Sequence, residues 1–168
     1  MLNIMDSMGA RARTGEVPAI GDLREVVEFL RVFVDRCHHA KEETLLFPAM
    51  RAAGLTAAEP TLVALLVDHE RGRESVAEIA RRIEGLERGE GDAVPALVRV
   101  MTSYTALLRD HITREERDCF NTADLELVVS VKDELAEGYD RIEEEVVGHG
   151  VHERFHALLD RLGHEYLA

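Results

Sequence analysis

The chain has 168 residues, of which 46% are hydrophobic and 5% aromatic, so Leu, Val and Ala must fill the core of one domain, residues 1–168. The formal net charge of −13 argues against nucleic acid and anionic membranes as partners, because both attract basic surfaces. There is no apolar run of about 18 residues and no cysteine-rich framework, with only Cys37 and Cys119 present, so we expect a cytoplasmic protein without a membrane span.

Turn residues divide the sequence into blocks whose apolar residues recur at steps of three and four, the spacing of one helix face. In chain order the blocks run over about 22–53, 59–88, 93–119, 124–147 and 151–166. Gly54 follows the first block as a residue that ends a helix. No segment shows the sustained alternation of a half-buried strand. The sequence therefore predicts an all-α fold.

An internal repeat is the most informative motif. Residues 38–47 read HHAKEETLLF, and residues 111–120 read HITREERDCF. Both copies carry a histidine, a basic residue, a Glu-Glu pair and a phenylalanine at the same offsets. Residues four apart share a helix face, so each histidine projects from the same side as the first glutamate of its copy. The pairs are His38 with Glu42 and His111 with Glu115.

Both pairs are predicted to face the core. His38 continues an apolar row that includes Val34, and His111 continues one that includes Leu108. His69 lies on the apolar face of the helix between them. A buried carboxylate without a partner is costly, and a metal ion is one effective compensation. The predicted metal ligands are His38, Glu42, His69, His111 and Glu115.

This donor set also limits the choice of metal. Imidazole and carboxylate without thiolate suit iron, manganese or zinc, and carboxylates on facing helices favour a dinuclear site of the iron type. Glu43 and Glu116, the second residues of the Glu-Glu pairs, lie about 100° further round the helix and are expected to face solvent. Tyr104 shares a row with His111 and is either a group beside the metal or a core tyrosine.

At these residues the sequence resembles the hemerythrin-like HHE cation-binding family. The likeness covers about residues 22–168 and is carried by the segments 37–48, 68–73 and 107–116. Residues 142–153 are similar to an extension found in one bacterial branch of that family.

The resemblance implies an up-down helical bundle of hemerythrin type, with a core over about 22–120 and a C-terminal helical extension over about 124–166. It further implies a di-iron centre that Glu42 and Glu115 bridge, with terminal ligands His38, His69 and His111. Members of the family bind dioxygen, nitric oxide or peroxide, sense iron or oxygen, or store iron. The motifs do not choose among these roles. An enzymatic role would be that of a di-iron oxidoreductase or a peroxidase- or catalase-like protein, and a homo-oligomer is left open.

The sequence departs from the family at its beginning. The family pattern opens with a helix that carries another ligand histidine, but residues 1–21 contain none. Either the chain starts within that helix, with residues 1–8 as its tail, or the C-terminal helix supplies the missing ligand. The candidates there are His149, His152, Glu153 and His156.

Two other functions are compatible with parts of the sequence. His152, Glu153 and His156 match the H-E-x-x-H helix of zinc hydrolases, in which the glutamate is the general base. A third ligand at the spacing of that motif is missing downstream. The remaining alternative is a helical interaction domain that binds no metal, and analysis of the metal content separates it from the main interpretation.

Overall fold

The computed structural model of the chain describes residues 1–148 and 150–167, without the side chains of Val146 and Val147. Every regular element in this part of the chain is helical, which confirms the predicted all-α fold. None of the described helices combines the length and the apolar character needed to cross a membrane.

The helices begin and end as follows. They are α1 (Leu2–Arg13), α2 (Ile20–Phe29), η1 (Leu30–His39), η2 (Glu42–Leu46), α3 (Phe47–Ala52), η3 (Thr56–Ala58), α4 (Glu59–Glu87), α5 (Ala93–Arg114), η4 (Glu115–Phe120), α6 (Asn121–Glu126), α7 (Val129–Ile142), η5 (Glu143–Val147) and α8 (Val151–Tyr166). The segments η1, η2, η4 and η5 are π-helical, and η3 is a 3-10 turn. Because α2, η1, η2 and α3 follow without a break in the helical backbone, residues 20–52 form one long rod.

The first two long helices end close to the predicted positions. Gly54 and Gly89 follow them with φ angles of 75° and 73°, a conformation that residues with a Cβ atom disfavour. The third helix differs from the prediction, because α5, η4 and α6 run without a break to Glu126. The chain turns only at Leu127 and Val128, whose ψ angles of 133° and 155° are extended. Leu127 is buried there, so this turn is held by the packing of an apolar side chain and contains no Gly or Pro.

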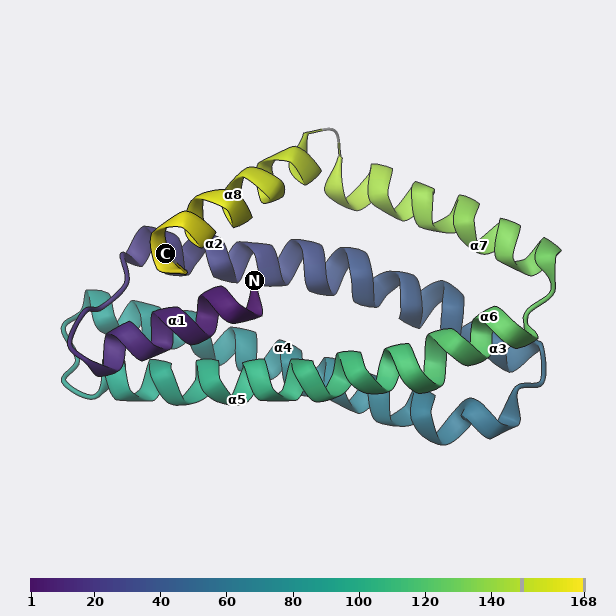
Figure 1. Cartoon of the computed structure of the whole chain (residues 1–168), viewed down its shortest axis with the longest axis horizontal. Helices are drawn as coiled ribbons and strands as arrows, with labels where there is room; N and C mark the ends of the chain where they lie inside the picture. Colours follow the sequence, from purple (N-terminus) through teal and green to yellow (C-terminus); the bar gives the residue numbers. More distant parts are fainter. Residues whose placement is uncertain (149, 168) are drawn as a thin grey trace.

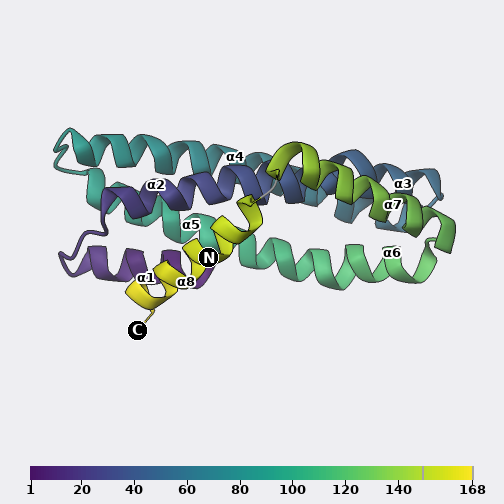
Figure 2. The same cartoon turned by 90° about the horizontal axis from the view of Figure 1, so that it is seen from above.

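Three long helical runs form the body of the molecule (Figure 1). The helices α4 and α5 pack along each other, α2 and η1 pack on α4, and α1 packs on α5. The C-terminal helices α7 and α8 lie on the side of the 20–52 rod away from α5 (Figure 1), and from above α7 follows the rod while α8 crosses from it toward α1 (Figure 2). Along this arch α7 contacts η2, η5 contacts η1, and α8 contacts α1 and α2. The chain ends are therefore close together, and the Ser7 hydroxyl donates a hydrogen bond to the Tyr166 carbonyl.

The buried apolar residues form two separate clusters. One joins α1, α2, α4, α5 and α8 and includes Met5, Leu23 and Leu162. The other joins the far halves of the helices and includes Phe47 and Leu65. The buried histidines and glutamates of the three long runs belong to neither cluster and lie between them in the sequence of each helix. A polar layer thus crosses the middle of the bundle.

The packing of α8 can be tested at Leu162, which is fully buried. Leu162→Ala should lower the free energy of unfolding by about 2–5 kcal/mol, because it removes a buried side chain and leaves a cavity. Leu125→Ala, at a site that is 72% exposed, is the matched control and should change stability by no more than about 0.5 kcal/mol. Urea unfolding monitored by circular dichroism measures both. Equal effects of the two substitutions would contradict the docking of α8 on the bundle.

Candidate metal centre

The residues of the polar layer come from helical segments with widened turns. His38 and His39 end η1, Glu42 begins η2, and Glu115 begins η4. Turns of the π type are rare and are found frequently at functional sites, where they re-aim side chains. His69 and His111 come instead from the regular helices α4 and α5. Three separate long runs therefore contribute to one layer.

Three imidazoles form the first group of this layer. His39, His69 and His111 are 3%, 1% and 2% exposed, and each offers a ligand atom within 4.8 Å of the other two. The rings of His39 and His69 are stacked with centroids 3.9 Å apart, and His111 stands edge-on with its centroid 5.0 Å from that of His69. We name these three residues the histidine trio.

The second group contains one imidazole and two carboxylates. His38, Glu42 and Glu115 also offer ligand atoms within 4.8 Å of one another. The His38 Nε2 atom lies 3.2 Å from Glu115 Oε1 and 3.8 Å from Glu42 Oε1. Both glutamates are buried, whereas the His38 side chain is 43% exposed. We name this set the glutamate group.

The two glutamates connect the groups. In Glu42, Oε1 faces His38 while Oε2 lies 3.2 Å from His69 Nε2. In Glu115, Oε1 faces His38 while Oε2 lies 3.7 Å from His111 Nε2. Each carboxylate therefore directs one oxygen to each group, which is the arrangement that a carboxylate bridging two metal ions requires.

Many polar atoms of this layer have no hydrogen-bond partner among the described residues. They are both ring nitrogens of His39 and His111, Nε2 of His69, both carboxylate oxygens of Glu42, and Oε1 of Glu115. A buried polar atom without a partner costs about 1–3 kcal/mol, and more when it is charged. So many of them in one place indicate that a cation completes the layer, and the nitrogen and oxygen donors fit such an ion.

Burial sets the protonation of the trio. It lowers the pKa of His39, His69 and His111, in the last case to about 4, so all three imidazoles are neutral at pH 7 and can donate a lone pair to a metal ion. Burial and the neighbouring Glu115 carboxylate raise the pKa of Glu42, because two carboxylates this close resist joint ionisation. Burial also opposes the charged form of His38, but the nearby carboxylates of Glu115 and Glu42 outweigh it and raise the His38 pKa.

The structure brings all five predicted ligands into the layer: His38, Glu42, His69, His111 and Glu115. Sequence reasoning missed a sixth residue, His39. A regular α-helix would turn His39 away from the face that carries His38, but the ten π-helical residues of η1 shift the buried face onto it. The only signal for this residue in the sequence is the His-His doublet.

Glu43 corrects a second expectation. It was expected to face solvent, but its Oε1 accepts a hydrogen bond from Nδ1 of His69 at 2.7 Å. Glu116, the matching residue of the second repeat, is exposed as expected. The two copies of the repeat are therefore not equivalent around the layer.

The C-terminal candidates lie outside both groups. His152 has its ring edge-on to Phe33 at 5.5 Å and its Nε2 atom 3.6 Å from Glu143. The ring of His156, with its centroid 6.4 Å from that of His152, is exposed, and Glu153 is exposed as well. No described His, Cys, Asp or Glu completes a three-ligand group with them, as a zinc hydrolase would need. His149 falls outside the described residues.

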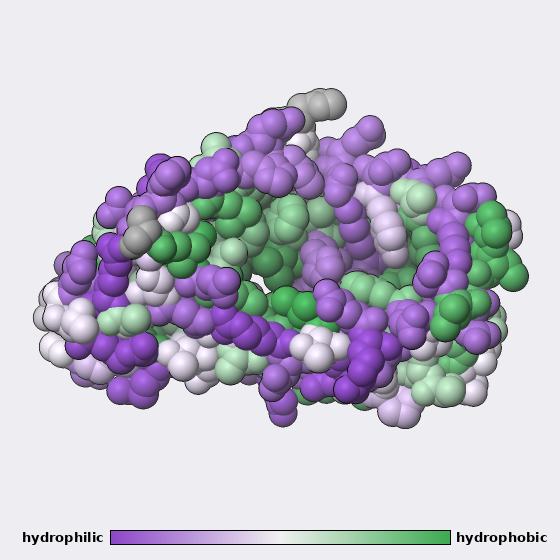
Figure 3. Space-filling model, in the orientation of Figure 1, coloured by the Kyte–Doolittle hydropathy of each residue, from purple (hydrophilic) through white to green (hydrophobic). Residues whose placement is uncertain are grey.

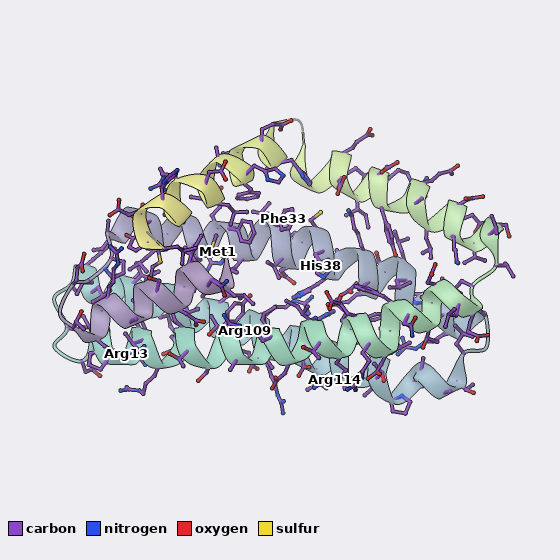
Figure 4. The ribbon with its side chains drawn as sticks, in the orientation of Figure 1. Met1, Arg13, Phe33, His38, Arg109 and Arg114 are labelled. Carbon is purple, nitrogen blue, oxygen red and sulfur yellow. The ribbon has the colours of Figure 1, made fainter. Side chains whose placement is uncertain are left out.

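A pocket of about 340 Å³ opens beside the glutamate group. His38, His39, His111 and Glu115 contribute its polar wall, and most of the remaining lining is apolar. The labelled residues Met1, Phe33 and His38 lie around its mouth (Figure 4), and the space-filling view shows a hollow there (Figure 3). Tyr104 lines the pocket and is otherwise a core residue, 2% exposed. Small molecules can thus approach His38 from solvent.

The sequence of the chain also matches a family model. Residues 1–123 match the family described as Hemerythrin HHE cation binding domain, a stretch that contains both groups of the polar layer. The match confirms the family resemblance and the expected bundle, but it includes α1 and ends before α7 and α8, whereas the likeness noted from the motifs extended to residue 168. Comparisons with curated proteins and with solved structures found no match.

The raised pKa of Glu42 makes the stability of the metal-free protein depend on pH. Because the folded pKa lies above the unfolded value, the contribution of Glu42 to stability is fully present below about pH 4 and is lost as the pH rises toward the folded pKa. Glu42→Gln cannot ionise, so the metal-free variant should gain stability over the wild type between pH 6 and 9, by at most about 1.4 kcal/mol per pH unit.

Urea unfolding of the metal-free proteins at several pH values measures this gain. Glu116→Gln, at the exposed end of a Glu-Glu pair, is the control and should follow the wild type. A Glu42→Gln variant that stays parallel to the wild type across this range would show that Glu42 is ionised in the folded protein.

Proposed function

The chain belongs to the hemerythrin HHE cation binding domain family, and on this premise we propose that it binds two iron ions side by side in the polar layer. The observation that carries the proposal is the orientation of Glu42 and Glu115. Each turns one carboxylate oxygen toward His38 and the other toward a histidine of the trio. Because the two oxygens of each carboxylate face different groups, a single ion at either group would meet only one oxygen of each. Two ions, one at each group, would use all four.

The residues divide between the two positions as the groups do. The histidine trio would hold the first ion, and His38 would hold the second, with both glutamates shared. The partnerless nitrogens and oxygens of the layer support this division, since two cations would satisfy all of them except Nδ1 of His39 and of His111, which face Asp35 and Asp68. The neutral state of the trio at pH 7 supports it as well, because a protonated imidazole cannot bind a metal.

The chemistry of the donors fits a pair of iron ions. Four imidazoles and two carboxylates without thiolate suit iron, manganese or zinc, and paired carboxylates between helices are typical of di-iron and di-manganese proteins. Both cysteines are buried and free, and neither belongs to a ligand group. Bound iron would supply reversible ligand binding and electron transfer, which no side chain of this layer offers.

We further propose that a small ligand such as dioxygen, nitric oxide or peroxide reaches the second ion. The glutamate group provides one imidazole where the trio provides three, so its ion would keep coordination positions free of protein ligands. His38 is also the most accessible member of the layer, with its side chain 43% exposed, and it lines the pocket. The mostly apolar lining of that pocket suits small uncharged molecules better than large polar substrates.

Metal analysis tests the first part of the proposal. The purified protein, or the metal-free protein loaded anaerobically with ferrous iron, should contain about two iron ions per chain, one for each ligand group. Oxidation should then give near-ultraviolet absorption from carboxylate- and imidazole-bound ferric iron. Elemental analysis and the optical spectrum measure both. Loading with zinc or manganese alone would overturn iron as the metal, and a protein that takes up no metal would overturn the site.

Substitutions separate the two metal positions. Glu42→Ala and Glu115→Ala should each lose most of the bound metal, because each removes a bridge. His39→Ala should weaken binding of the ion at the trio more than binding of the ion at the glutamate group, and His38→Ala should have the opposite effect. Glu116→Ala is the control and should retain both ions. Full metal content in Glu42→Ala and Glu115→Ala together would contradict the assignment.

Access to the second ion can be tested with azide, a small anion that binds ferric iron. Azide should change the visible spectrum of the oxidised protein, and Phe33→Trp, which narrows the pocket mouth, should slow that change. Val63→Trp, on an exposed site of α4 that does not line the pocket, is the control and should react at the wild-type rate. No spectral response to azide in the iron-loaded wild type would exclude an open position.

A further inference from the structure

A partly exposed arginine, Arg73, binds two carboxylates that lie beside two histidines of the trio. Arg73 lies one turn after His69 on α4. Its Nε atom donates to Asp35 at 2.7 Å, and its Nη2 atom donates to Glu43 at 2.6 Å. One planar guanidinium thus fixes two carboxylates that come from different parts of the 20–52 rod.

Each of these carboxylates faces the outer nitrogen of one trio imidazole. Glu43 accepts a hydrogen bond from His69 Nδ1 at 2.7 Å. Asp35 lies 3.5 Å from His39 Nδ1, within reach of a hydrogen bond after a small adjustment. In His69 the opposite nitrogen, Nε2, points at Glu42 in the centre of the layer. The outer carboxylates are therefore placed to keep the proton on Nδ1 and the lone pair of Nε2 toward the centre.

The third imidazole repeats the arrangement with separate residues. Asp68 lies 3.8 Å from His111 Nδ1, and the Arg114 guanidinium donates a hydrogen bond to the same oxygen of Asp68. Asp68 is 7% exposed, so it is held at the edge of the layer. A carboxylate anchored by an arginine therefore stands behind every member of the trio, although only His69 has a full hydrogen bond.

We propose that Arg73 is a positioning residue of the metal centre: by holding Asp35 and Glu43, it fixes the ring orientation and tautomer of His39 and His69 for metal binding through Nε2. This inference rests on the proposed function for its purpose, but the tautomers exist in the metal-free protein and can be measured there. Carboxylates behind metal-binding histidines usually raise metal affinity about 10- to 100-fold. Arg73 would contribute through two such carboxylates at once.

The experiment measures two properties of the same variants. Nitrogen-15 NMR of the histidine rings reports the tautomer in the metal-free protein at neutral pH. Competition with a chromophoric chelator reports the affinity for zinc, a probe ion for imidazole sites. Arg73→Met should leave His69 in a mixture of tautomers and lower the affinity of the tighter site about 10- to 100-fold. Arg73→Lys keeps the positive charge but loses the planar guanidinium that donates to both carboxylates. Its zinc affinity and tautomer ratio should lie between those of Arg73→Met and the wild type.

Glu43 provides a sharper pair of variants. Glu43→Gln and Glu43→Leu both remove the charge, but only glutamine keeps an acceptor for His69 Nδ1. Glutamine should preserve the tautomer and most of the affinity, and leucine should lose both. Because the pair differs in one acceptor, it decides the question even if Arg73→Met proves unstable. The control is Glu70→Gln, since Arg73 also donates to Glu70 at 2.7 Å, but Glu70 is exposed and faces no histidine.

Each outcome supports or overturns a separate statement. Wild-type tautomer and affinity in both Arg73→Met and Glu43→Leu would overturn the positioning role. An effect of Glu70→Gln equal to that of Arg73→Met would also overturn it, because a general loss of charge around the arginine would then explain the result. A wild-type protein that takes up neither zinc nor iron would overturn the proposed function, while the NMR measurement would still decide whether Arg73 orients the rings.

Discussion

Two carboxylates buried across the middle of an apolar bundle are the constraint on which the rest of this structure depends. Glu42 and Glu115 lie between two hydrophobic clusters, where a leucine side chain would be buried without a desolvation cost. Effective desolvation of each such charge costs several kcal/mol, and removal of one partner from a buried pair is costly again. The three long helical runs therefore have to meet in one register, because only that register brings imidazoles to both carboxylates. A metal pair would turn this costly layer into the contact that joins the helices.

The widened turns explain how one short segment contributes to both ligand groups. Adjacent residues on a helix point about 100° apart, so neighbouring side chains ordinarily cannot serve the same interior. At the end of η1, His39 joins the trio while His38 joins the glutamate group. Glu42 then begins η2 and faces both groups. The π-helical backbone is therefore part of the site, because it places a pair of neighbouring histidines on the inner face.

Much of this arrangement could be predicted from the sequence, and the misses share a physical cause. The repeat of histidine and glutamate at a four-residue step identified His38, Glu42, His111 and Glu115. Apolar periodicity located the long helices and added His69, so only His39 was missed. Both arguments assume a regular helix, so they fail where η1 widens. Glu43 was misjudged because its partner His69 lies on another helix, and a contact between helices leaves no local pattern. The turn at Leu127 was missed for a similar reason, since it depends on tertiary burial and no Gly or Pro marks it.

The layer is also asymmetric, and the asymmetry follows from which helices surround it. The trio draws one imidazole from each long run, its three residues are at most 3% exposed, and an arginine-anchored carboxylate stands behind every ring. The glutamate group has a single imidazole, and Met1 and Leu2, which line the adjoining pocket at the start of the chain, have apolar side chains. Two ions bound as proposed would therefore differ in the number of imidazoles that hold them, three at the trio and one at the glutamate group. If two ions bind as proposed, the ion at the trio would help to hold the helices together, and the ion at the glutamate group, beside the pocket, would be the one at which an external ligand could exchange.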